Sequence, residues 1–125
     1  MIEEIIAEDA YASDYPFSQA IRHGDTLYLS GSVPREAGTQ EIVDGDIAEQ
    51  TEKVFENVEA ILKAAGTSLD NVIRVTVFLT DMDDFEPFND VYRSKFERPY
   101  PARSAVEVSD LAKEYDVEME VTAAV

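Results

Sequence analysis

Residues 98–108 read Arg98-Pro99-Tyr100-Pro101-Ala102-Arg103-Ser104-Ala105-Val106-Glu107-Val108. The two prolines fix their own φ angles at about −65° and hold the residues before them in extended conformations. A strand is predicted to follow, with Ser104, Val106 and Val108 on one face and Arg103, Ala105 and Glu107 on the other. We expect the face that carries Arg103 to point away from the core.

The last nine residues alternate more strictly. They read Val117-Glu118-Met119-Glu120-Val121-Thr122-Ala123-Ala124-Val125. The apolar row, which begins at Val117, predicts the core face, and Glu118 and Glu120 then lie on the opposite face. If both strands lie close together in one sheet, Arg103 and these carboxylates lie on the same face of that sheet. From the pattern alone, Arg103 could equally bind a ligand carboxylate or form a cross-strand ion pair with Glu118 or Glu120.

The remaining elements follow from periodicity and turn residues. We predict strands at 2–6, 18–23, 26–30 and 72–79, helices at 47–65 and 85–96, and final strands at 103–108 and 117–125. Asp44 or Asp46 is expected to cap the first helix, and Gly66 to end it. Strand 72–79 is apolar on both faces, which predicts a central strand with one face against another subunit. The order predicts one α+β domain over residues 1–125, a ferredoxin-like or related sandwich with both helices on one face.

Composition restricts the function classes. The chain has 10 basic and 27 acidic residues, a net charge of −17, and no cysteine. So acidic a surface disfavours binding to nucleic acid, because phosphates are recognised by basic side chains. The lack of cysteine excludes disulfides and thiolate chemistry. Salt would screen the self-repulsion of these charges, so we expect adaptation to a salty cytoplasm, as in halophiles. No apolar run approaches the roughly 18 residues of a membrane span, and the start lacks a signal-peptide pattern, so a soluble cytoplasmic protein is expected.

Two further features are better explained by structural roles than by catalysis or metal binding. His23 is the only histidine and adjoins a predicted turn, so we expect a solvated residue rather than a base or a ligand. Residues 81–84, Asp-Met-Asp-Asp, lack the spacing of a calcium loop and precede a helix, so capping is the favoured role. Neither a metal site nor a cofactor is predicted.

Several motifs together resemble the RidA family of enamine/imine deaminases. The motifs are Tyr15-Pro16-Phe17-Ser18-Gln19-Ala20, Ser30-Gly31-Ser32-Val33-Pro34, the helix from Asn57 to Gly66, Val75-Thr76-Val77-Phe78-Leu79, Phe88-Asn89-Asp90-Val91-Tyr92 and Pro101-Ala102-Arg103-Ser104. Each motif is weak alone, but their order and spacing run nearly end to end. The resemblance implies a chorismate mutase-like fold, assembled as a homotrimer with clefts between subunits.

The resemblance also implies an activity and its residues. Such a protein hydrolyses 2-aminoacrylate and related 2-imino acids to 2-oxo acids and ammonia, without a cofactor. Arg103 would bind the substrate carboxylate and Glu118 would position the attacking water. Ser30 and Gly31 match a loop near the bound acid, and Asn89 matches a helix asparagine near the site.

This chain departs from the best-known members at three positions of that pattern. Phe17 replaces a tyrosine and therefore offers packing without a hydroxyl. Tyr15 replaces a glycine at the lip of the cleft, and Ala105 replaces a cysteine near the arginine. The change at Phe17 is expected to affect substrate preference more than activity.

Two other functions remain open from the sequence. A non-catalytic module that binds a small carboxylate, such as a 2-oxo acid, needs Arg103 but no catalytic Glu118. A nuclease, as claimed for some relatives, conflicts with the charge of −17.

Overall fold

The computed structural model describes residues 1–125 and contains a six-stranded sheet with two α-helices. The elements are β1 (Ile2–Ile5), β2 (Ala20–His23), β3 (Thr26–Leu29), α1 (Ile47–Ala64), β4 (Val72–Leu79), α2 (Phe85–Lys95), β5 (Ala102–Glu107) and β6 (Val117–Ala124). Two 3-10 turns, Leu69–Asn71 and Met82–Asp84, precede β4 and α2. The predicted element order is confirmed, with differences of one or two residues at most ends.

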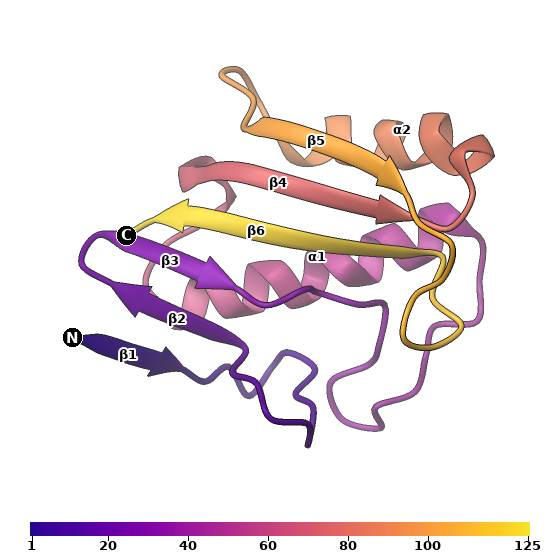
Figure 1. Cartoon of the computed structure of the whole chain (residues 1–125). Helices are drawn as coiled ribbons and strands as arrows, with labels where there is room; N and C mark the ends of the chain where they lie inside the picture. The colour runs from indigo at the N-terminus through magenta and orange to yellow at the C-terminus, as the bar shows by residue number, and fades with distance from the viewer.

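The strands are ordered β1-β2-β3-β6-β4-β5, and only β4 and β5 run parallel. A parallel pair needs a crossover connection, which α2 supplies. Figure 1 shows both helices on the same side of the sheet, behind it in that view. The predicted chorismate mutase-like α+β sandwich, with its helices on one face, is confirmed.

Local sequence explains the bounds of α1. Asp46, not Asp44, is its N-cap: the Asp46 carboxylate accepts from the Glu49 N–H at 2.9 Å, and the Glu49 side chain accepts from the Asp46 N–H at 3.3 Å. This reciprocal pair is a capping box, which satisfies two backbone donors at the helix start. Gly66 follows the helix with a φ of 82°, a conformation that favours glycine.

The core lies between the sheet and the helices. Val117, Met119, Val121 and Ala123 of β6 are buried on the helix side, as the alternation predicts. The prediction that residues 72–79 form a central strand is also confirmed, because β4 lies between β6 and β5. No helix covers the other face of the sheet, which we call the open face.

Aromatic side chains join the two helices. The ring of Phe96, just after α2, lies 5.8 Å from that of Phe55 on α1 and 4.8 Å from that of Tyr92 on α2, centroid to centroid. Phe88 is 5.8 Å from Tyr92. Such tilted contacts suit aromatic quadrupoles and hold α2 beside α1.

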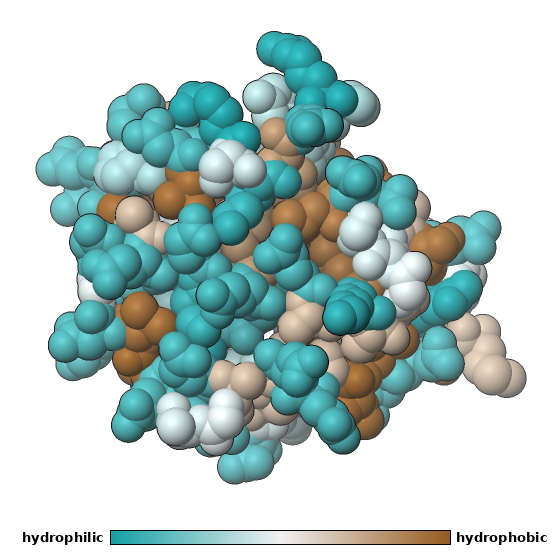
Figure 2. Space-filling model, turned by 180° about the vertical axis from the view of Figure 1, so that it is seen from behind, coloured by the Kyte–Doolittle hydropathy of each residue, from teal (hydrophilic) through white to brown (hydrophobic).

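The back of the molecule, seen in Figure 2, is mostly hydrophilic, with hydrophobic residues visible between the polar ones. The outer surface on the helix side is therefore mainly polar. Neither helix is both long enough and apolar enough to cross a membrane.

Candidate functional site

Glu118 projects from β6 onto the open face and lies against a glycine. A short bridge joins the chain after β3 to β6: Ser32 N–H donates to Met119 O at 2.7 Å, and Met119 N–H donates to Ser32 O at 3.0 Å. The bridge holds Gly31 so close that a Cβ atom there would lie 2.1 Å from Glu118 Oε2. Only glycine leaves room for the carboxyl group in this position.

The surroundings of Glu118 favour its protonated form. Burial raises the pKa of the Glu118 carboxyl, and the neighbouring charge of Glu120 raises it further. A carboxyl group with a raised pKa exchanges its proton closer to neutral pH than an exposed glutamate does. This property suits proton transfer to and from a ligand.

The cavity beside Glu118 has a volume of about 620 Å³ and is lined by residues from several loops. Phe17, Ser30 and Gly31, which the RidA-like pattern implies for ligand binding, line this cavity, and so does Tyr15. Ser30 Oγ donates to Ser18 O at 2.6 Å, which ties the two loops together. The Phe17 ring is 53% exposed and offers only an apolar surface. The volume lies within the range typical of small-molecule sites.

Arg103 lines a second, smaller cavity of about 380 Å³ beside α2. Its guanidinium carbon lies 4.7 Å from the centroid of the Tyr92 ring, 5.7 Å from Phe85 and 5.9 Å from Phe88. No carboxylate lies within 4.0 Å of Arg103. Aromatic faces stabilise the charge but leave the donor edge of an arginine free for a carboxylate.

Two polar atoms beside Arg103 are buried without a hydrogen-bond partner. These atoms are Asn89 Oδ1 and Tyr92 Oη, and both residues line the same cavity as Arg103. Buried polar atoms without partners are rare and costly in folded proteins. These unpaired atoms and the nearby guanidinium make this cavity a candidate site for contact with a ligand or a second chain.

The prediction that Arg103 lies on the face away from the core is wrong. Arg103 pairs with Val75 of β4, whose side chain is fully buried on the helix side, whereas Glu118 pairs with Phe78 on the open face. The aromatic rings of α2 accept the guanidinium on the apolar side of the sheet. Within one chain, Arg103 and Glu118 therefore lie on opposite faces of the sheet, and the two cavities have no residue in common.

Other predicted positions are distributed between these regions. Asn89 lies with Arg103, as described, but Ala105 lines neither cavity and packs against the core on the same face of β5. His23 is exposed at the end of β2, where a turn was expected.

Two features of these cavities are not predicted from the sequence. One is Tyr92 beside Arg103, and the other is a cluster of Tyr11, Arg35 and Tyr115 in the Glu118 cavity. The periodicity of α2 marked Tyr92 as a core residue, which conceals its hydroxyl group. The other three residues come from distant loops, so no local spacing signals that they meet.

The protein therefore has an α+β fold with two separate cavities, one lined by Glu118 and the other by Arg103. The family model described as Endoribonuclease L-PSP matches residues 7–125. The chain therefore belongs to this family, which includes the RutC and RidA proteins.

Individual relatives cover nearly the whole chain. A RutC family protein of Pyrococcus horikoshii is 50% identical over 123 residues, which are 98% of each chain. A 2-iminobutanoate/2-iminopropanoate deaminase of Bos taurus is 38% identical over 98% of this chain and 90% of its own. The crystal structure of Escherichia coli TdcF with bound serine has a TM-score of 0.93 and 36% identity, and the match covers 98% of each chain.

Proposed function

We propose that this protein hydrolyses 2-aminoacrylate and other reactive 2-imino acids to 2-oxo acids and ammonia. The observation that carries the proposal is the Glu118 carboxyl group, which is held against Gly31 in a cavity and has a raised pKa. Arg103, without a carboxylate partner, is the proposed anchor for the carboxylate of the substrate. Phe17, Ser30 and Gly31 would shape the cavity, and Asn89 would contact the bound acid.

The chemistry needs one water molecule and movable protons. 2-Aminoacrylate first tautomerises to 2-iminopropanoate, as a proton moves from its nitrogen to its methylene carbon. Water then adds to the carbon of the C=N bond and a proton goes to the nitrogen, and the resulting carbinolamine collapses to a C=O bond and free ammonia. Glu118 as a carboxylate would orient the water and accept its proton, and would then deliver a proton to the departing nitrogen. A raised pKa favours both directions of this transfer near neutral pH.

We further propose that the site is completed by a second copy of the chain, in a homotrimer. Arg103 and Glu118 lie on opposite faces of the sheet, so one ligand can meet both only if they come from different subunits. The open face carries half-exposed apolar side chains, Tyr28 and Val106 among them, which suit an interface. A monomer by light scattering would contradict the assembly.

The relatives support this reaction class. Bos taurus and Dermatophagoides farinae proteins at 38% and 39% identity are named 2-iminobutanoate/2-iminopropanoate deaminases. The family description also contains the word endoribonuclease. A net charge of −17 opposes RNA binding, because phosphate recognition depends on basic side chains.

The test generates imino acids in place with an amino-acid oxidase and follows their loss. Wild type should accelerate the loss, and Arg103→Ala and Glu118→Ala should each abolish the acceleration. A Glu118→Ala variant that loses turnover while it still binds a 2-oxo acid separates the two proposed roles. If folded wild type binds 2-oxo acids but accelerates nothing, the protein is a carboxylate-binding module.

A further inference from the structure

Arg35 lies beside two tyrosine side chains in the same cavity as Glu118. Its guanidinium carbon lies 5.4 Å from the centroid of the Tyr11 ring and 5.5 Å from that of Tyr115. Its Nε donates to Tyr115 Oη, and its Nη1 donates to Gln40 O at 2.7 Å. The planar cation is thus fixed in orientation by neutral groups alone.

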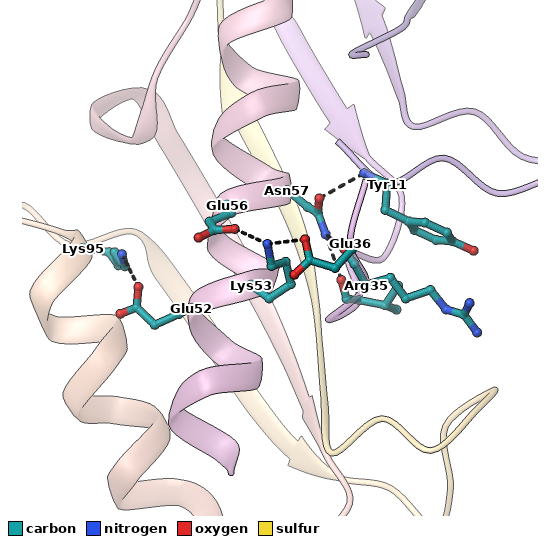
Figure 3. A network of polar contacts seen from close by, with 9 residues as sticks. Tyr11, Arg35, Glu36, Glu52, Lys53, Glu56, Asn57 and Lys95 are labelled. Atoms are coloured by element: carbon teal, nitrogen blue, oxygen red, sulfur yellow. Dashed lines mark hydrogen bonds and ion pairs between the residues drawn. The ribbon is translucent and has the colours of Figure 1, made fainter. Parts of the chain in front are cut away.

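A buried asparagine on α1 fixes the backbone of this cluster. Asn57, which is 5% exposed, donates through Nδ2 to Arg35 O at 2.9 Å and to Val33 O at 3.1 Å. Its Oδ1 accepts from the Tyr11 N–H at 3.0 Å. In Figure 3 the side chains of Tyr11 and Arg35 extend in the same direction, away from α1. A group attached in this way to a rigid helix is preorganised for binding.

The charge of Arg35 has no carboxylate partner, although the chain has 27 acidic residues. Three of these, Glu4, Glu118 and Glu120, line the same cavity, yet none lies within 4.0 Å of a nitrogen of Arg35. Burial and Glu120 raise the pKa of Glu118, with no opposing effect of Arg35. The cation and the carboxyl group therefore occupy separate parts of one cavity.

We propose that Arg35 binds a second anionic group of the ligand, so that this protein prefers dicarboxylic 2-imino acids over monocarboxylic ones. This inference rests on the proposed function, in which Arg103 binds the carboxylate next to the imine. The carboxylate at the far end of the substrate then meets Arg35, whose Nη2 donates to no group of the chain. Arginine binds carboxylates through its N–H groups, and a single free guanidinium nitrogen still forms a charge-assisted hydrogen bond with a carboxylate.

The test compares ligands that differ only in the distal charge. Imines are generated from glutamate and from norvaline, which have the same chain length, and kcat/KM is measured for wild type, Arg35→Met and Arg22→Met. Arg22 donates to Gly24 O on the hairpin and lines neither cavity, so it controls for the loss of one positive charge. In parallel, calorimetry measures the binding of 2-oxoglutarate and 2-oxopentanoate.

Wild type should favour the dicarboxylic imine. Arg35→Met should reduce kcat/KM for that imine, and the affinity for 2-oxoglutarate, by about tenfold or more, because a charge-assisted hydrogen bond is lost. The monocarboxylic ligands should change by less than about threefold, and Arg22→Met should leave the preference unchanged.

Equal losses for both ligand classes would show that Arg35 only supports the fold, and would overturn the inference. If wild type consumes neither imine, the proposed function fails, and calorimetry alone decides the role of Arg35. If Arg35→Met then binds 2-oxoglutarate more weakly but binds 2-oxopentanoate as wild type does, the role of Arg35 is supported. Unchanged binding of 2-oxoglutarate by this variant refutes it.

Discussion

Replacing Gly31 with alanine tests the contact that holds Glu118 in place. The added Cβ atom would lie 2.1 Å from Glu118 Oε2 and 2.8 Å from Cδ. Because atoms in contact stay about 3.5 Å apart, the carboxyl group must move by roughly 1 Å or more. The φ angle of Gly31 is not positive, so the backbone itself accepts alanine.

The expected result is a loss of activity without a loss of fold. A 1 Å displacement of a reacting group reduces the rate about 100-fold, so kcat/KM for imine hydrolysis should fall by about this factor. The thermal midpoint should change little, because the flexible carboxyl end of Glu118 can move aside. Stopped-flow loss of an imine and a thermal melt of the same sample measure both quantities.

Gly38→Ala is the matched control, because a Cβ atom at Gly38 meets nothing within 4 Å. It should keep full activity. In a Glu118→Ala background there is no carboxyl group to displace, so adding Gly31→Ala should not weaken the remaining binding of a 2-oxo acid. Near wild-type activity of Gly31→Ala, or a further loss of 2-oxo acid binding in the Glu118→Ala background, would show that Gly31 does not act through the Glu118 carboxyl group.

Four further predictions concern stability. Burial raises the pKa of Glu118 above its ordinary value of 4.5, so the folded chain binds this proton more tightly than the unfolded chain does. The protonated carboxyl group therefore stabilises the folded chain at low pH, and this stabilisation is lost as the pH rises through the raised pKa. The thermal midpoint of Glu118→Gln should therefore exceed that of wild type by a margin that grows as the pH is raised from about 4 to 7. A margin that stays constant over this range would contradict the prediction. Asp46→Ala should lower the free energy of unfolding in urea by about 1 kcal/mol through loss of the capping box, while Asp44→Ala should not. Tyr92→Phe should leave the thermal midpoint unchanged or higher, because its buried hydroxyl has no partner, but should weaken 2-oxo acid binding if that hydroxyl meets the ligand. Potassium chloride between 0.1 and about 2 M should raise the thermal midpoint by screening the charge of −17, and a flat response would argue against adaptation to salt.

Strongly periodic segments could be predicted from the sequence. The strict alternation of residues 117–125 identified β6 and its buried face, because a strand with one face in the core has a period of two. The three- and four-residue spacing of α1 identified that helix in the same way. Both signals are local, so they needed no knowledge of the neighbouring elements.

The orientation of β5 could not be predicted. Its six residues include small and polar side chains on both faces, and Val106 made the wrong face look more apolar. Arg103 lies on the helix side because Tyr92 and its aromatic neighbours on α2 accept the guanidinium there. This stabilisation comes from another element, so the alternation within β5 does not encode it. The clustering of Arg35 with two tyrosines depends on loop packing in the same way.

The most direct test of the account is to mix two inactive variants. Arg103→Ala and Glu118→Ala chains are unfolded together, refolded in equal amounts and assayed for imine hydrolysis. If each site takes Arg103 from one subunit and Glu118 from the next, every mixed trimer regains both residues at one of its interfaces. With random mixing this is about one quarter of all interfaces in the sample, and a similar share of wild-type activity returns. If the mixture is no more active than either variant alone, although mixed trimers have formed, Arg103 and Glu118 do not serve one shared site.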